Sequence, residues 1–167
     1  MKKLIIILLT GLSTGSGWSQ DLLGFESITR IDIIDYKNAE AQALEAANYL
    51  FSTAIDSFKA EREKAITFML IWMDGTPDYV FYIDDNVNFF TRSQNNLLAI
   101  FLAGLTKSSL ENPGLSQNPK ELKYRAIHLF VDYCNNPSNH IKPYRELEQL
   151  IKANEKERLR NYVENGS

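Results

Sequence analysis

The sequence predicts an all-α protein: a bundle of five or six antiparallel helices with one short extended segment at about residues 76–83. Two observations carry this prediction. Apolar residues recur at three- and four-residue spacing through most of the chain after residue 38. Clusters rich in Gly, Pro, Asn and Asp separate these runs, and the connections have the lengths that join antiparallel helix neighbours.

Composition places the chain among globular proteins. Hydrophobic residues make up 44% and charged residues 23% of its 167 residues, the balance of a protein with a packed core. The net charge is −3 and no basic stripe occurs, so nucleic acid is not expected as a partner. Residues 20–91 carry 5 Lys and Arg against 13 Asp and Glu, whereas residues 92–167 carry 11 against 8. This division favours packing of the two halves on each other, with an acidic partner-facing surface as the alternative.

The N-terminus has the three parts of a secretory signal. Two lysines precede an apolar run that begins at Leu4–Leu9, and Gly17 and Ser19 fit the small positions before a cleavage site. The apolar run is far shorter than the roughly 20 residues that a membrane-spanning helix needs. We therefore expect residues 1–19 to be a signal peptide, with no transmembrane segment after its removal and export to the periplasm or the outside.

One helical domain is expected at residues 38–167, after an irregular lead-in at residues 20–37. Asn38 is a candidate N-cap, and the helix after it carries an apolar stripe that a neighbouring helix could approach closely. The stripe consists of Ala39, Ala43, Ala46, Ala47 and Leu50.

Residues 39–73 contain no Gly or Pro. One helix of that length is improbable, so we expect a break within residues 52–57, where Ser, Thr and Asp favour turns over helix interiors. The second helix then runs from about Phe58 to Met73. It ends in AITFMLIWM, which is apolar on nearly every side and is typical of a helix in the middle of a bundle.

A second central helix is expected after a candidate cap at Ser93, because Leu97–Leu105 is again apolar all round. Asn118 and Pro119 have the pattern of an N-cap and a first helical residue. The helix that they begin has one apolar face, formed by Leu122, Ala126, Ile127, Phe130, Tyr133 and Cys134. A last helical region follows Pro143.

The last helical region either continues or breaks near Asn154 before a final apolar run. Successive helices resemble the helical hairpins of a repeat array, first 93–112 with 119–135 and then 119–135 with 143–153. No consensus recurs at a fixed period, however, so the sequence favours a compact bundle.

Residues 72–86, WMDGTPDYVFYIDDN, are the most unusual stretch. Carboxylate oxygens are suitable calcium ligands, although the stretch lacks the spacing of an EF-hand loop. The candidate metal ligands are Asp74, Asp78, Asp84 and Asp85. The candidate ligand-binding residues are its four aromatics, Trp72, Tyr79, Phe81 and Tyr82.

The same stretch has a structural interpretation, which the sequence favours. Gly75 can end the preceding helix in the left-handed conformation, and Pro77 restricts Thr76 to extended geometry. Asp84 or Asp85 can cap a short helical turn. The aromatics then anchor an extended segment across the bundle.

Two further groups of residues could carry chemistry. Glu121, His128 and Asp132 share one helix face, as a metal triad or an acid–base pair would, but an Arg at i+4 from Glu121 favours a solvated face with an ion pair. Cys134, the only cysteine, lies on an apolar stripe, so we expect a buried structural thiol and no internal disulfide. A pair between Cys134 and His140 stays open because a loop could bring them together.

Three stretches resemble a group of exported, mostly helical proteins from Bacteroidetes. They are ALEAANYLFST, WMDGTPDYVFYID and AIHLFVDYCNNPSN, and the W-M-x-G-T-P-D-Y-x-F element within the second is the most distinctive. The resemblance spans approximately residues 43–153. It implies a secreted or periplasmic helical domain, and it implies no activity and no functional residues.

The sequence contains no nucleotide-binding loop, nucleophile elbow or HExxH motif. We therefore expect a non-enzymatic binding or structural module of the cell envelope, with no cofactor and with a protein or small ligand of the envelope as partner. The alternative is a calcium-dependent binding protein or a carboxylate-based hydrolase that uses the aspartates around residues 74–85. Two well-placed carboxylates suffice for glycoside hydrolysis, so enzymatic activity stays open.

Overall fold

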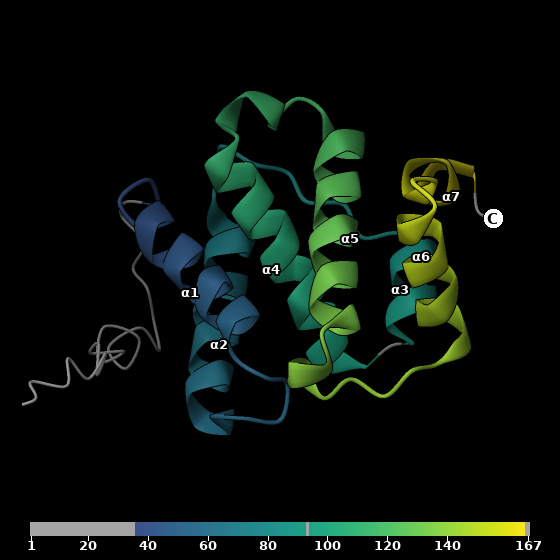
Figure 1. Ribbon diagram of the computed structural model, residues 1–167. Coiled ribbons are helices and arrows are strands. Elements are labelled where there is room, and N and C mark those ends of the chain that lie inside the picture. Colours follow the sequence, from purple (N-terminus) through teal and green to yellow (C-terminus); the bar gives the residue numbers. More distant parts are fainter. Residues whose placement is uncertain (1–35, 93, 166–167) are drawn as a thin grey trace, which may run out of the picture.

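The computed structural model describes residues 36–92 and 94–165 (Figure 1). This part of the chain contains seven α-helices, two short 3₁₀-helices and no strand. The α-helices are α1 (Glu40–Ser52), α2 (Lys59–Gly75), α3 (Asp85–Thr91), α4 (Asn95–Glu111), α5 (Pro119–Asn135), α6 (Arg145–Glu155) and α7 (Leu159–Asn165). The all-α prediction is confirmed, and the antiparallel arrangement stays a prediction. The predicted number of helices is too low, because α3 and α7 have only seven residues each and such short helices leave a weak periodic signal.

Helix α4 lies at the centre of the fold, in contact with α1, α2, α3 and α5 (Figure 1). All of Leu97–Leu105 is buried except the half-buried Leu98, as the apolar sequence predicts. Gly104 allows the close approach of α5. A Cβ atom added to Gly104 would lie 2.9 Å from the carbonyl oxygen of Ala126 and 3.0 Å from its Cα. The missing side chain therefore sets the distance between the two helices.

Helix α2 is not a central helix, although its apolar sequence predicts that it lies in the middle of the bundle. Its buried face, which includes Phe68 and Trp72, packs against α1 and α4. Leu70 on another face is 41% exposed, and Thr67 is also exposed. The prediction is wrong because, within the described residues, α2 packs chiefly against α1 and α4, and Leu70 on its outer side stays exposed.

The predicted break within residues 52–57 is confirmed, since α1 ends at Ser52 and α2 begins at Lys59. The buried side chain of Arg62 fixes this connection. Its Nη1 donates to the carbonyl oxygens of Leu50 and Thr53, each at 3.0 Å, and to the Thr53 hydroxyl at 2.7 Å. The guanidinium thus pairs carbonyl groups that the end of α1 leaves without helical partners.

The predicted N-caps have mixed outcomes. Asn118 caps α5 as predicted, because its Oδ1 accepts a hydrogen bond of 3.1 Å from the backbone of Glu121. Asn38 is not the N-cap of α1, which begins at Glu40 with Ala39 in the N-cap position. Ser93 lies outside the described residues.

At the C-terminal end, the interpretation with a break near Asn154 is confirmed. Helix α6 ends at Glu155 and α7 begins at Leu159. Helix α7 lies on the same side of the fold as α3 and α6 (Figure 1). Its Tyr162 and Val163 are partly buried and pack against the core. The predicted signal peptide, residues 1–19, and nearly all of the predicted lead-in lie outside the described residues. In the described part of the chain, no helix combines the length and apolar character needed to cross a membrane.

Candidate functional site

Residues 76–84 connect α2 to α3 and run behind α4 and α5 (Figure 1). The connection begins without the left-handed glycine that was predicted, because Gly75 is the last helical residue of α2. Gly75 instead leaves room for Tyr36: an added Cβ atom would overlap the outer end of the Tyr36 ring, so a side chain here requires Tyr36 to move. The Trp72 indole donates a hydrogen bond of 3.2 Å to the Tyr36 carbonyl, so both residues hold the start of the connection.

Three of the four predicted ligand-binding aromatics form a cluster that packs on the core. The ring centroid of Trp72 lies 5.8 Å from that of Tyr79 and 6.0 Å from that of Phe81, and the last two are 6.3 Å apart. Trp72 and Tyr79 are buried, and burial raises the pKa of the Tyr79 phenol. Only Tyr82 is exposed, at 64%. The predicted anchoring is therefore present, and Tyr82 alone faces solvent.

The four candidate metal ligands do not come together. Among the described residues, no three His, Cys, Asp or Glu side chains form a group that could hold a metal ion. Asp84 caps α3, as predicted, because its Oδ1 accepts a hydrogen bond of 3.3 Å from the backbone of Val87. Asp74, Asp78 and Asp85 are exposed.

The second oxygen of Asp84 forms an ion pair with Lys123 of α5, at 2.5 Å. Partial burial raises the pKa of Asp84, but the hydrogen bond and charge of Lys123 outweigh it, and the pKa is lowered. The pair links the end of the 76–84 connection to the first turn of α5.

The polar face of α5 is a set of ion pairs. Glu121 accepts from Arg125 at 3.0 Å, as the spacing predicts, and from Arg160 of α7 at 2.8 Å. The hydrogen bond from Arg160, together with that from Arg125, lowers the pKa of Glu121. His128 pairs with Asp132 at 3.1 Å. These pairs satisfy the charges on the surface, so the residues do not form the triad.

The thiol of Cys134 is buried, as predicted, and burial raises its pKa to about 12. A thiol with such a pKa is a poor nucleophile at neutral pH. His140 does not approach it, because its Nδ1 lies 2.9 Å from Asp56 Oδ1 in the connection between α1 and α2. The structure therefore forms no Cys–His pair.

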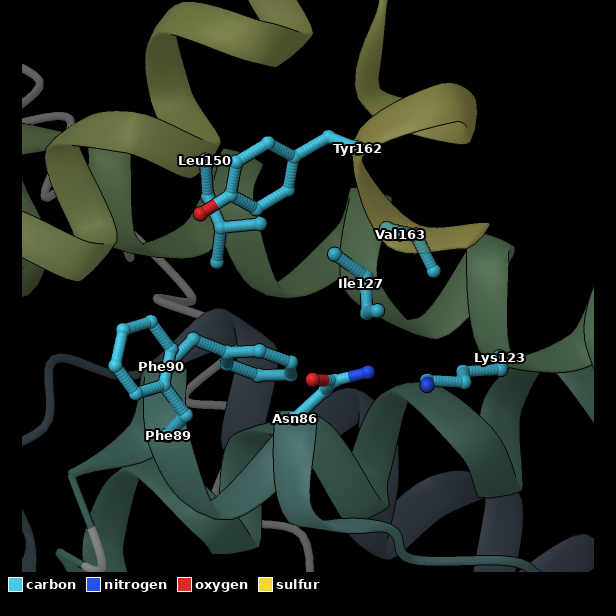
Figure 2. A pocket seen from close by; sticks show the side chains of 8 residues that line it. All are labelled: Asn86, Phe89, Phe90, Lys123, Ile127, Leu150, Tyr162 and Val163. Atoms are coloured by element: carbon cyan, nitrogen blue, oxygen red, sulfur yellow. The ribbon is translucent and has the colours of Figure 1, made fainter. Parts of the chain in front are cut away.

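A cavity of about 80 Å³ lies between α3, α5, α6 and α7 (Figure 2). It is lined by Asn86, Phe89, Phe90, Lys123, Ile127, Leu150, Tyr162 and Val163. Its walls are apolar apart from Asn86, Lys123 and the Tyr162 hydroxyl. The Asn86 amide and the Lys123 ammonium point toward each other at one side of the cavity (Figure 2).

A wider groove of about 450 Å³ adjoins this cavity. Its lining residues are Tyr82, Asp84, Asn86, Pro119, Lys120, Lys123 and Val163. The cavity and the groove share Asn86, Lys123 and Val163. Together they form a site with a narrow inner end and a wider mouth, both mostly apolar, and the mouth carries the charged side chains of Asp84, Lys120 and Lys123. We call the two together the α3–α5 site.

Sequence reasoning found only the Tyr82 and Asp84 edge of this site. The adjacent Phe89 and Phe90 weakly indicated an apolar surface here, since two neighbouring aromatics on a short amphipathic helix cannot both face the core. Nothing in the sequence indicated that Asn86 and Lys123 share a site, because they are 37 positions apart and belong to no motif. Tertiary contact between four helices creates the site.

No protein-family model, curated protein or solved structure matches the chain. Any conclusion about function therefore depends on the residues of the α3–α5 site and on the sequence itself.

Proposed function

We propose that this protein is an exported, non-enzymatic binding protein whose ligand occupies the α3–α5 site. The observation that carries the proposal is the position of Lys123, a cation that lines both the apolar cavity and the wider groove. Ligand sites in proteins commonly combine mostly apolar walls with a few convergent polar groups.

The inner end of the site suits an apolar group. Phe90, Ile127 and Leu150 are all buried and line the cavity. An aliphatic chain or a ring that enters here leaves water for an apolar surface, which is favourable in proportion to the buried area.

The mouth of the site suits an anionic group. The Lys123 ammonium can donate three hydrogen bonds, and Asp84 accepts one of them. A carboxylate on the ligand can accept from Lys123 and from the Asn86 amide. The ligand that fits best is thus a small amphipathic anion, with an apolar tip inside and a carboxylate at the mouth.

The proposal also states that the protein is exported and that it binds its ligand without catalysing a reaction. The tripartite N-terminus and the resemblance to exported helical proteins support export. The charged residues that line the α3–α5 site are Asp84, Lys120 and Lys123; Asp84 is the only carboxylate among them, and it is paired with Lys123. That arrangement supports binding rather than nucleophilic or acid–base chemistry.

A titration with 4-phenylbutyrate tests the proposal, because this probe joins a ring and a short aliphatic chain to a carboxylate. We expect shifts of the Ile127, Leu150 and Val163 methyl resonances in NMR spectra. The Lys123→Gln variant should bind about fivefold more weakly, the loss of about 1 kcal/mol expected for one partly exposed ion pair. The Asp84→Asn variant should bind more tightly, since it removes the carboxylate that competes for Lys123.

The matched control is Lys152→Gln, which removes an exposed lysine of α6 that does not line the site. It should leave the affinity unchanged. If the probe shifts none of the three methyl groups in the unmodified protein at millimolar concentration, the proposed function is wrong.

A further inference from the structure

The backbone of Tyr79–Ile83 is unpaired within the described residues. No hydrogen bond joins any N–H or C=O group of these five residues to that part of the chain. The hydrogen bonds nearest in sequence lie at either end: Asp78 N–H donates to the Thr76 hydroxyl, and Asp84 C=O accepts from Val87. Backbone groups without a partner in the protein bind water or an added chain.

The side chains of this segment alternate, as they do in a strand. Tyr79 is buried and Phe81 is half-buried against Trp72, whereas Val80 and Tyr82 are 62% and 64% exposed. None of the five residues has a positive φ. Its β-branched and aromatic residues are those that strands prefer. The segment is therefore an extended chain, held by two aromatics on one side, with no neighbouring strand.

We propose that residues 79–83 are a strand-addition site, at which an extended peptide of a partner protein pairs its backbone with this segment. Exposed strand edges bind peptides in this way, with affinity from main-chain hydrogen bonds and specificity from alternate side chains. Val80 and Tyr82, with the 49%-exposed Ile83, supply the apolar contacts for those side chains. This site is separate from the binding of a small anion in the cavity.

The charge around the segment indicates which peptide fits. Residues 65–91 contain no Lys or Arg, and the exposed Asp78 and Asp85 lie on either side of the apolar residues. Of the nearby lysines from other elements, Lys37 is paired with Glu40, and Lys120 lines the groove beside Tyr82. Asp84 is paired with Lys123 and therefore contributes less negative charge than Asp78 or Asp85. The partner segment is thus a short run of β-branched or aromatic residues with Lys or Arg at both ends.

A second copy of this chain fits less well. Antiparallel pairing centred on Phe81 would place Asp78 of each copy opposite Asp84 of the other, and parallel pairing in register would place each aspartate opposite itself. Like charges that face each other across a strand pair are destabilising. The same repulsion disfavours an anionic membrane surface.

The test uses a seven-residue peptide with lysine at both ends and alternating valine and threonine between them, and backbone NMR of the full exported chain. We expect slow hydrogen exchange at alternate amides within residues 79–83, those on the edge that faces the peptide, only when the peptide is bound. Two further peptides carry N-methyl groups on the odd or on the even residues. Because alternate N–H groups of a strand face the same neighbour, one methylated peptide should bind like the parent and the other should lose binding.

A double variant tests whether Asp78 and Asp85 attract a positively charged peptide. The double substitution Asp78→Asn and Asp85→Asn should weaken binding of the lysine peptide about fivefold and leave binding of the matching glutamine peptide unchanged. Phe89→Ala changes a residue that lines the cavity and neither adjoins residues 79–83 nor lines the groove, so it should weaken binding of the small anion and leave peptide binding unchanged, which separates this proposal from the function proposed for the cavity. The proposal is overturned if the parent peptide does not bind, or if the two methylated peptides behave alike. It is also overturned if the amides of residues 79–83 exchange slowly without peptide, as in a dimer of this chain.

Discussion

The two connections that flank α2 differ in how their backbone polar groups are paired. Residues 53–58 join α1 to α2, and residues 76–84 join α2 to α3. Each leaves a helix end and crosses the surface without regular structure. They differ in whether the rest of the protein pairs their polar groups.

The first connection is closed by hydrogen bonds from three distant elements. Thr53 accepts from Arg62 and from the Tyr133 hydroxyl, the latter at 2.8 Å. Ile55 donates its backbone N–H to Asn139, and Asp56 pairs with His140. This connection is a fixed part of the structure.

The second connection is held only by its aromatic side chains and its ends. Tyr79 and Phe81 pack on Trp72, and Asp84 fixes the far end by capping α3 and pairing with Lys123. Between these points the backbone stays unpaired in the described residues, and Tyr82 faces solvent. Of these two connections, only the second leaves a run of backbone groups unpaired within the described residues, and it lies beside the α3–α5 site, where both proposed ligands would bind.

The largest expected effect is at Arg62. Arg62→Met should lower the free energy of unfolding by about 3 kcal/mol, because it leaves buried carbonyl groups of the first connection without a donor. Urea denaturation measures the loss. Arg145→Met, at an exposed arginine of α6, is the control and should change stability little. A loss at Arg62 no larger than at Arg145 would mean that the first connection does not depend on the guanidinium.

A smaller loss of stability is expected for loss of the hydroxyl group of Tyr133 than for loss of Arg62, and none for loss of the Tyr82 hydroxyl. Tyr133→Phe removes the hydroxyl that donates to Thr53 and should cost about 1 kcal/mol. Tyr82→Phe, in the second connection, removes an exposed hydroxyl and should leave the free energy of unfolding unchanged. Equal losses for the two variants would contradict the distinction between the connections.

The ion pair of Asp84 should contribute a small, pH-dependent stability. Because the pKa of Asp84 is lower in the folded protein, its contribution is complete above the unfolded pKa and is lost as the pH falls through the folded value. Asp84→Asn keeps an N-cap residue but loses the ion pair. At pH 7 it should be less stable by about 0.5 kcal/mol, since the carboxylate is half-exposed.

This difference between Asp84→Asn and the unmodified protein should shrink below about pH 4, where aspartate begins to protonate in the unfolded chain. Urea denaturation at a series of pH values follows it. A difference that stays constant down to pH 2 would show that the carboxylate charge is not responsible.

The smallest expected effect is that of calcium. Since the aspartates around residues 74–85 do not form a group, calcium at about 5 mM, above the range of weak extracellular calcium sites, should leave the Tm unchanged. Sodium chloride of equal ionic strength is the control. A Tm increase that saturates with calcium and disappears in Asp85→Asn would restore the calcium-dependent alternative.

Features that depend on neighbours in the chain could be predicted from the sequence. The apolar period identified α4 and α5, and the caps at Asn118 and Asp84 were recognisable because a side chain bonds to a backbone group three residues away. The interruption between α1 and α2 followed from the clustering of Ser, Thr and Asp. The break after α6 remained one of two alternatives, since no strong stop signal lies there.

Features that depend on which elements meet could not be predicted. The apolar run of α2 has the same character as that of α4, yet only α4 is surrounded. Arg62 gave no signal of burial, because its hydrogen-bond acceptors are carbonyl groups, which every residue carries. Arg160 reaches Glu121 from a helix 39 positions away, and no local pattern encodes such a pair.

The sequence by itself determined the helical class, the position of the aromatic connection, a helix cap at Asp84 or Asp85 and the buried position of Cys134. Periodicity and capping are local, and they act within a few residues. Tertiary structure alone decided that Leu70 on the outer side of α2 stays exposed, that three of the four aromatics pack together, and that Lys123 meets Asn86 beside an apolar cavity. Burial and charge pairing are properties of surfaces in contact, and the partners that create them are brought together only when the chain has folded.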